Sequence, residues 1–274
     1  MSGLSSIPMY LATIWDETAR VGKFAKSDPV TKADIAYLQK IAPKLNSPDA
    51  LLKDFRALKV VLGAYGMSDR MPQTALLKKL LTQDPQAKGS LARGLANQAA
   101  FRFATALGNW KSSGSSPFSN TNTLSQIANS YAQNSFEANQ GKQIPGMQQA
   151  LYFRRTIASA TTVPMVISDS KLMEVVSGAL DLPVQFGILD YERQVVELTK
   201  KLKFDKFKDP AFVDKFAQRY LAAKAAANMT ADPMVGLISG ATAAIAATPN
   251  DMLNTLNQKN GITSGTGFTL SLFA

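Results

Sequence analysis

The sequence contains one helical pattern twice, at a spacing of about 115 residues, and this repeat constrains the fold more than any other feature. Read forward without a gap, the two stretches share identical residues at four places: Tyr37 and Tyr152, Asp54 and Asp169, Val60-Val61 and Val175-Val176, and Gly63-Ala64 and Gly178-Ala179. The register holds for about thirty residues, and most substitutions between these places keep their chemical character. Such self-similarity predicts a duplicated structural unit. We therefore expect two related multi-helix halves.

Apolar residues in the first copy recur at three- and four-residue spacing, as in Leu51, Phe55, Leu58 and Leu62. This spacing forms one apolar stripe on a helix, and alternating strand patterns are nearly absent from the chain. The sequence therefore predicts an all-α fold. The expected helices cover residues 7–25, 29–45, 48–67, 71–83, 86–109, 122–140, 183–203, 209–228 and 249–258, with the second copy of the central helix at 166–182.

Composition shifts divide the chain into four expected parts. Residues 1–110 form the first helical repeat, and the stretch 111–123 is a flexible Ser/Gly linker. Residues 124–228 form the second repeat. The remainder, 229–274, combines a small-residue helical segment with a flexible tail.

The chain contains no cysteine and no histidine among its 274 residues. Disulfides, thiolate catalysis and cysteine-ligated metals are thereby excluded, and the commonest general base and transition-metal ligand is missing as well. The acidic residues are too dispersed for a Ca²⁺ loop. We expect no enzymatic activity, no cofactor, no metal and no small-molecule substrate.

No run of about 20 apolar residues predicts a membrane span. The first residues lack a basic segment ahead of an apolar one, so no general secretory signal is expected.

The sequence contains 30 Lys and Arg residues against 20 Asp and Glu residues, and one dense basic cluster. The cluster consists of Lys200, Lys201, Lys203, Lys206 and Lys208, interleaved with Phe204 and Phe207. Lysines among aromatic residues can bind nucleic acid or an anionic bilayer. The simpler interpretation is a solvated helix end followed by a loop, with both phenylalanines folded into the core, and we favour it.

The repeated residues admit a chemical and a structural interpretation. Asp54 and Asp169 could belong to a paired-carboxylate site, but an ion pair or cap contact is simpler. The glycines at 63 and 178 fit close packing or helix termination despite a cost of about 1 kcal/mol for a helical glycine. Tyr37 and Tyr152 are expected to bury their rings and leave their hydroxyl groups near water or a partner.

The only catalytic motif of note is Ser168-Asp169-Ser170-Lys171, in which a lysine could activate a serine. The motifs that accompany it in known enzymes are absent, so we interpret it as a coincidence.

The final residues, from Asn260 onward, are rich in Gly, Ser and Thr and end in an apolar run. Phe268, Leu270, Leu272 and Phe273 could dock on a partner, for example by adding a strand to a sheet edge, or could simply be frayed.

Two stretches carry a resemblance to a known family: Lys32-Ala-Asp-Ile-Ala-Tyr-Leu-Gln-Lys-Ile41 and Asn46-Ser-Pro-Asp-Ala-Leu-Leu-Lys-Asp-Phe-Arg-Ala-Leu-Lys-Val-Val-Leu-Gly-Ala-Tyr-Gly-Met67. They resemble an uncharacterised alphaproteobacterial helical family whose genes often lie in flagellar clusters. The resemblance covers about residues 28–109 and, more faintly, 149–228. It implies a flagellum-associated helical protein and offers no catalytic residues.

The sequence thus favours a non-enzymatic structural or interaction protein of the flagellum, as an axial component, an exported part or an assembly factor. Its expected partners are flagellar proteins or further copies of itself, and its expected location is the cytoplasm or, after export by the flagellar apparatus, the flagellum. The alternative is a basic regulator that binds nucleic acid or an anionic membrane through Lys200–Lys208, although nucleic acid is the less favoured partner.

Overall fold

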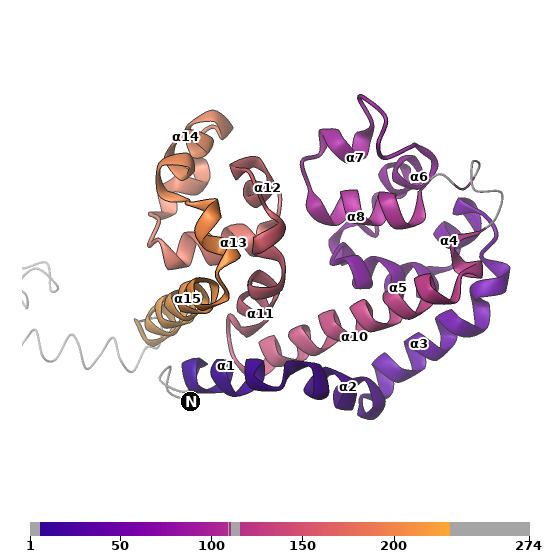
Figure 1. The fold of residues 1–274 in the computed structure, drawn as a ribbon, viewed down its shortest axis with the longest axis horizontal. Coiled ribbons are helices and arrows are strands. Elements are labelled where there is room, and N and C mark those ends of the chain that lie inside the picture. The colour runs from indigo at the N-terminus through magenta and orange to yellow at the C-terminus, as the bar shows by residue number, and fades with distance from the viewer. Residues whose placement is uncertain (1–5, 109, 111–115, 231–274) are drawn as a thin grey trace, which may run out of the picture. The chain divides into compact units, whose positions relative to one another are not determined.

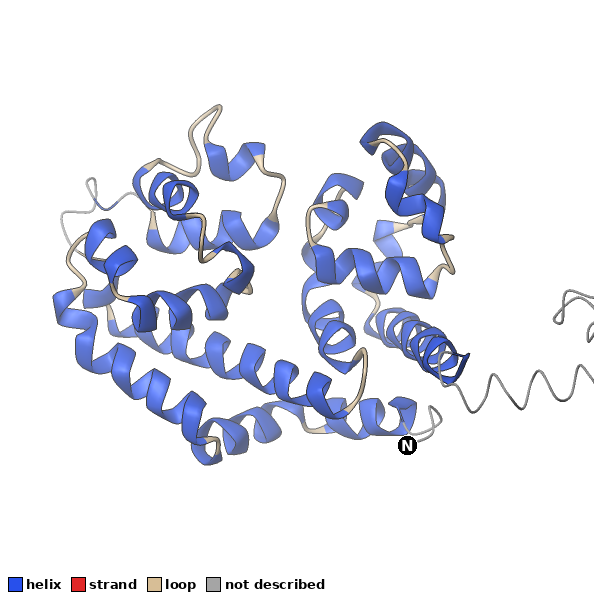
Figure 2. Ribbon diagram, turned by 180° about the vertical axis from the view of Figure 1, so that it is seen from behind, coloured by secondary structure: helices blue, strands red, loops and turns tan. Residues whose placement is uncertain are grey.

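The computed structural model describes residues 6–108, 110 and 116–230, and every regular element in this part of the chain is helical. Figure 2 shows helices joined by loops, with no strand among the described residues. The all-α prediction is confirmed. Of the described residues, those up to Ala225 belong to one compact unit.

The helices of the first part of the chain are α1 (Ser6–Trp15), α2 (Glu17–Ser27), α3 (Pro29–Ile41), α4 (Pro48–Lys53), α5 (Phe55–Tyr65), α6 (Thr74–Thr82), α7 (Leu91–Gly94) and α8 (Gln98–Leu107) (Figure 1). Those of the second part are α10 (Thr121–Gln143), α11 (Met147–Thr156), α12 (Val163–Ile167), α13 (Ser170–Ala179), α14 (Tyr191–Lys201) and α15 (Pro210–Thr230). Short 3-10 turns connect them: η2 (Ala42–Lys44), η3 (Ser68–Arg70), η4 (Pro117–Ser119), η5 (Ile157–Ser159), η6 (Val184–Ile188) and η7 (Phe204–Lys208).

Several expected helices are divided in two by capping residues. The segment 48–67 breaks at Asp54, whose carboxylate accepts a hydrogen bond of 2.8 Å from the Ala57 amide and so begins α5. The segment 86–109 contains α7 and α8, and Asn97 caps α8 by accepting from the Ala100 amide at 2.9 Å. Asp and Asn side chains compete for backbone amides in this way. Because apolar periodicity continues across such caps, periodicity did not reveal the breaks.

Two hydrophobic cores lie within the unit formed by residues 1–225. The first gathers buried residues between Leu38 and Tyr131, and the second gathers Tyr10 together with residues between Phe136 and Leu221. Helix α10 contributes Ile127 and Tyr131 to the first core and Phe136 to the second. The expected boundary between residues 1–110 and 124–228 therefore does not separate the cores, because α1 packs into the second and the start of α10 into the first.

Part of the expected linker 111–123 is packed structure. Residues 111–115 lie outside the described part of the chain, but Phe118 is only 1% exposed and its ring lies 5.9 Å from that of Trp110. The Ser116 hydroxyl also donates to the Leu45 carbonyl. The prediction of a flexible linker was wrong for residues 116–123, because one phenylalanine in a polar stretch anchors it to the core.

The same backbone contacts recur in the two copies of the pattern. Turn η2 precedes α4 and α5, as η5 precedes α12 and α13. At the ends of α5 and α13, Met67 donates its amide to the Leu62 carbonyl at 2.8 Å, and Leu182 donates to Ser177 at 2.9 Å. The residues before these donors, Gly66 and Asp181, have φ angles of 74° and 50°, so both helices end in the left-handed conformation. These matched contacts support the duplication, which remains a prediction.

Candidate functional site

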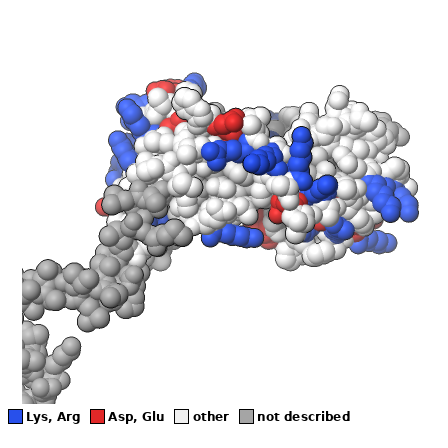
Figure 3. Space-filling model, turned by 90° about the horizontal axis from the view of Figure 1, so that it is seen from below, with Lys and Arg blue, Asp and Glu red and all other residues white. Residues whose placement is uncertain are grey.

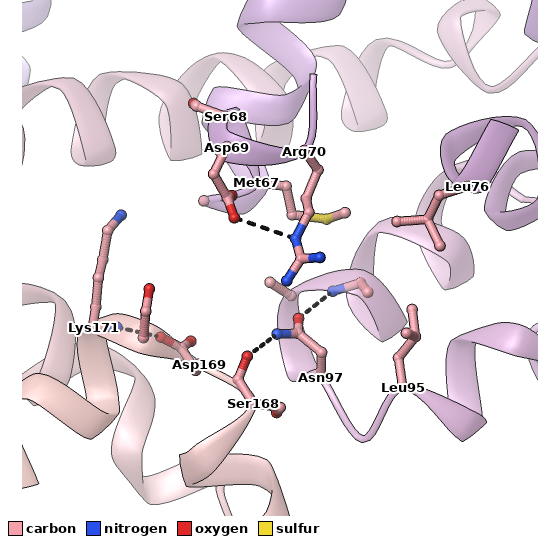
Figure 4. Close-up of a pocket in the computed structure, with 14 residues that line it drawn as sticks. Met67, Ser68, Asp69, Arg70, Leu76, Leu95, Asn97, Ser168, Asp169 and Lys171 are labelled. Atoms are coloured by element: carbon pink, nitrogen blue, oxygen red, sulfur yellow. Dashed lines mark hydrogen bonds and ion pairs between the residues drawn. The ribbon is translucent and has the colours of Figure 1, made fainter. Parts of the chain in front are cut away.

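A cleft of about 470 Å³ lies where the two copies of the pattern face each other. One wall comes from the end of α5, turn η3 and the start of α8, and the other from residues 168–171 at the start of α13 (Figure 4). The charged residues that line it are Asp69, Arg70, Asp169 and Lys171. Because the Ser168-x-x-Lys171 motif falls in this cleft, its geometry decides whether the motif could be catalytic.

Ser168 and Lys171 do not form a nucleophile and base. The Ser168 hydroxyl lies 3.0 Å from the Ala96 carbonyl and 3.1 Å from the Met165 carbonyl, which can accept its one proton. The Lys171 ammonium lies 4.9 Å from the centre of the Tyr152 ring, and Figure 4 shows its side chain extending away from Ser168. A serine nucleophile requires a base within hydrogen-bonding reach of its hydroxyl. The motif instead builds the junction between α12 and α13.

The start of α8 contacts the second copy of the pattern beside this cleft. The Asn97 side-chain amide donates to the Ser168 carbonyl at 2.8 Å, as Figure 4 shows, while its oxygen caps α8. The side-chain amide of Gln98 donates to the Ser159 carbonyl at 3.1 Å. Asn97 thus fixes the start of one helix and the position of the other wall with one side chain.

The two repeated aspartates serve as helix caps with a tyrosine partner. The Tyr37 hydroxyl donates to Asp54 at 2.7 Å, and the Tyr152 hydroxyl donates to Asp169 at 2.7 Å. Asp169 also accepts from the amides of Lys171 and Leu172 at 3.1 and 3.2 Å. Burial raises the pKa of Tyr152 above its ordinary value, and the Asp169 carboxylate raises it further. The hydroxyl therefore stays protonated as a donor, which agrees with the structural interpretation of both aspartates.

Each tyrosine hydroxyl is thus bonded to a carboxylate of its own half. Tyr152 is only 2% exposed, so the expectation that its hydroxyl lies near water was wrong. Tyr37 is only partly buried, and for its hydroxyl the expectation stays a prediction.

The repeated glycines are sites of close packing, against an aromatic ring. A Cβ atom on Gly63 would lie 2.8 Å from the Tyr131 ring, and one on Gly178 would lie 2.7 Å from the Tyr220 ring. Both distances are shorter than real Cβ contacts allow. Close packing was expected, and the structure shows that the close neighbour in each case is a tyrosine ring.

Asp34 is a buried carboxylate with two cationic partners, a cluster that the sequence analysis missed. Its carboxylate accepts from Arg56 at 2.8 Å, from Lys59 at 2.9 Å and from the Tyr131 hydroxyl at 2.7 Å. Burial alone would raise the pKa of Asp34, but the hydrogen bonds from Lys59, Tyr131 and Arg56 outweigh it and hold that pKa below its ordinary value. The spacing between Asp34 and Tyr131 is 97 residues, and no local pattern predicts a contact of that range.

Glu174 occupies a comparable place in the second core. It accepts from Gln149 at 3.0 Å, from the Tyr220 hydroxyl at 2.8 Å and from Lys224 at 3.0 Å. Burial would raise its pKa, but hydrogen bonds from Lys224 and Tyr220 lower it below its ordinary value. In both cores, one carboxylate therefore holds the tyrosine that packs on the repeated glycine.

The five lysines of the basic cluster are all exposed, and neighbouring carboxylates interrupt them. Lys200 bonds Glu197 at 2.8 Å, and Lys208 lies 3.4 Å from Asp205. Lys206 lies over the Phe212 ring at 5.7 Å. Phe207 is 2% exposed and packs among the rings of Phe153, Phe204, Phe212 and Phe216. Phe207 is therefore a core residue and cannot stack on a base.

Figure 3 shows the distribution of charge on one face of the molecule. Several Lys and Arg side chains lie near one another across the middle of this face, with a few carboxylates beside them, and uncharged residues cover most of the rest. Among the described residues, no group of three or more Asp or Glu side chains could hold a metal ion.

Phe268, Leu270, Leu272 and Phe273, the residues of the expected docking tail, lie outside the described part of the chain. The same holds for the expected helix 249–258.

The exposed apolar residues form a second feature that the sequence analysis did not identify. Trp15 is 91% exposed, and on turn η6 Val184 is 92% and Ile188 85% exposed. For α1, the sequence did contain an indication of an exposed apolar face, since a tryptophan ends a ten-residue segment that has no charged residue. For η6, the sequence offered no comparable signal.

Comparisons with known proteins identify a family but not an activity. A family model described as a protein of unknown function (DUF1217) matches residues 64–213, more than half of the chain. A crystal structure of protein AGR_C_984 from Agrobacterium tumefaciens is similar, with a TM-score of 0.70 and 21% sequence identity, covering 80% of this chain and 92% of that one. At this identity it shows the fold alone. A comparison with curated proteins found no match.

The expected resemblance to an uncharacterised alphaproteobacterial helical family is confirmed. Its extent differs from the expectation: the match begins at residue 64, near the end of the two quoted stretches, runs through residues 110–148 and ends at residue 213.

Proposed function

This chain belongs to the DUF1217 family of proteins of unknown function, and we propose that it is a non-enzymatic helical interaction protein of the bacterial flagellum. It acts there as an axial component, an exported part or an assembly factor, by contact with flagellar proteins or with further copies of itself. The flagellar setting is supported by the family resemblance found in the sequence. The contact mechanism is supported by the structure of the exposed surface.

One observation carries the contact mechanism: large apolar side chains are exposed on turn η6. Val184 and Ile188 stand on η6 beside the buried Phe186, which is 6% exposed and belongs to the second core. Neighbouring residues, among them Leu182, Phe186 and Leu189, line a recess of about 390 Å³. Clustered exposed apolar residues on a soluble scaffold mark sites of association. We therefore assign the principal protein contact to η6.

A complementation experiment tests this assignment. In a strain that lacks the gene, the chain with Val184→Asp and Ile188→Asp should fold but fail to restore swimming, because charges would prevent apolar docking. The matched control is Thr121→Asp with Ser125→Asp, exposed residues of α10 that do not line this recess, which adds the same charge away from η6. If the gene deletion leaves swimming unchanged, the flagellar function is wrong. If the double variant swims as well as the control, the contact lies elsewhere.

The alternative function, a regulator that binds nucleic acid or an anionic membrane through Lys200–Lys208, is weaker on the same structure. Glu197 and Asp205 bond two of the five lysines, and Phe207 is buried. Phosphate-driven binding weakens steeply with added salt, whereas apolar docking does not. This alternative would be supported if the chain bound nucleic acid or anionic vesicles, if that binding weakened steeply with added salt, and if Lys203→Gln with Lys206→Gln abolished it.

A further inference from the structure

Helix α1 presents an uncharged apolar face to solvent. The helix contains no charged residue, and its exposed residues include Leu11, at 45%, and Trp15, at 91%. Its opposite side is buried in the second core through Tyr10 and Thr13, which are 0% and 2% exposed. Leu11 and Trp15 are four residues apart and so lie on one face of the helix.

The orientation of α1 is fixed by polar contacts, so this exposure is built into the fold. The Tyr10 hydroxyl donates to Asp214 at 2.9 Å, and Arg154 also bonds Asp214 at 2.8 Å. In the next helix, Glu17 pairs with the same Arg154 at 3.1 Å. Rotating α1 to bury Trp15 would break the Tyr10 bond and expose its ring.

Helix α2 follows directly and carries unpaired positive charge. Arg20, Lys23 and Lys26 are exposed, and none has an ion-pair partner among the described residues. Of the two carboxylates in this region, Glu17 is engaged by Arg154, which leaves Asp16 as the exposed one. Figure 1 shows α1 and α2 lying end to end. The apolar helix is therefore followed by a segment in which three exposed cations outnumber one exposed carboxylate.

We propose that α1 and α2 dock on the surface of an anionic lipid bilayer, with α1 lying in the plane of the interface. Leu11 and Trp15 enter the boundary between headgroups and acyl chains, and the α2 cations bind the anionic headgroups. An apolar helix face flanked by Lys and Arg, with a tryptophan at its edge, has the chemistry of such interfacial helices. Among the described residues, no helix is long and apolar enough to span a membrane.

Charge complementarity favours a bilayer over a second copy of the chain. Two copies whose α1 helices meet in parallel would bring two sets of α2 cations together, and like charges across an interface oppose association. The face of a 10-residue helix is also small beside the roughly 800 Å² per partner of a stable interface. A bilayer needs no such area, because each buried side chain and each cation adds to the attraction.

Tryptophan fluorescence of the full chain, with vesicles as the probe, tests the proposal directly. The chain has two tryptophans, and Trp110 is only 8% exposed, so a blue shift of emission reports Trp15. We expect the shift, and co-sedimentation, with vesicles containing phosphatidylglycerol and not with pure phosphatidylcholine. Leu11→Ser with Trp15→Ser should weaken co-sedimentation at least about tenfold. Lys23→Gln with Lys26→Gln should weaken it by about fivefold per lysine.

The matched control is Val184→Ser with Ile188→Ser, which removes equally exposed apolar side chains elsewhere and should leave vesicle binding unchanged. All substituted residues are exposed, so circular dichroism and melting temperature should stay those of the original chain. Absence of binding to anionic vesicles overturns the proposal, as does equal loss in the Val184 and Ile188 control. A concentration-dependent dimer that the Leu11 and Trp15 variant abolishes, without vesicle binding, assigns the face to a second copy instead.

Discussion

At the scale of single residues, Gly63 and Gly178 have no room for a side chain. Their tyrosine neighbours cannot swing away freely, because the Tyr131 hydroxyl is bonded to Asp34 at 2.7 Å and that of Tyr220 to Glu174 at 2.8 Å. Alanine at either position must therefore displace a ring from a bonded position. A small residue was predictable from the repeat, but its ring partner was not.

We predict that Gly63→Ala and Gly178→Ala each lower the free energy of unfolding by about 1–3 kcal/mol through overpacking. The gain of about 1 kcal/mol that alanine brings to a helix offsets only part of the cost of displacing the ring. Gly22→Ala on α2 is the control, since a Cβ atom there would have no other atom within 4 Å and the change should stabilise the chain. Urea denaturation measures all three. An increase in stability for Gly63→Ala, similar to that of the control, would contradict the overpacking at this position.

Asp34 should make stability depend on pH. Its pKa in the folded chain is lowered from an ordinary value of 3.8, so the folded state favours the charged form. The stabilisation is therefore complete above about pH 4 and is lost as pH falls through the lowered folded-state pKa. We expect Asp34→Asn to cost about 1.5–3 kcal/mol at pH 7, and this difference should shrink toward zero in strong acid.

Unfolding titrations between pH 7 and pH 2 check this, with exposed Asp69→Asn as the comparison. A stability difference between the Asp34 variant and the original chain that stays constant over this range would refute the linkage.

At the scale of elements, the repeated aspartates decide where helices begin. Asp54 and Asp169 cap α5 and α13, and each also holds a tyrosine of the preceding helix. Tyr152 is 2% exposed, so removal of Asp169 leaves a buried hydroxyl without its acceptor. The same loss at Asp54 affects Tyr37, which is only partly buried and can reach water.

We therefore predict that Asp54→Ala costs about 1 kcal/mol as a lost cap and that Asp169→Ala costs about 1–3 kcal/mol more. Asparagine at either position should retain most of the cap, because it is an equally good N-cap residue. Thermal melts measure the ranking of these variants.

Ser168→Ala and Lys171→Ala should change stability or assembly at most. If the purified chain shows catalytic turnover that disappears in one of these variants while the melting temperature stays unchanged, the cleft contains an active site.

At the scale of the whole molecule, local pattern predicted the helices, while distant contacts decided how they assemble. The repeat indicated the positions of Tyr37, Asp54 and their counterparts, and helical periodicity indicated the fold class. Neither could place Tyr131 against Asp34 or Tyr10 against Asp214, because those pairs are 97 and 204 residues apart. The Ser168-x-x-Lys171 motif also could not show the direction of the Lys171 side chain, because this side chain approaches the Tyr152 ring, which lies on another helix.

The last prediction concerns the tail, which the described residues do not include. Phe268, Leu270, Leu272 and Phe273 are apolar side chains close together near the end of the sequence, and such residues favour a docking role. The described cores use only residues up to Leu221. We therefore expect a chain cut after Asn260 to keep its helical circular dichroism and melting temperature but to lose partner capture or swimming in a complemented deletion strain. If the shortened chain restores full swimming and captures the same partners, the tail has no docking role, and the contact must lie on helical surfaces such as η6.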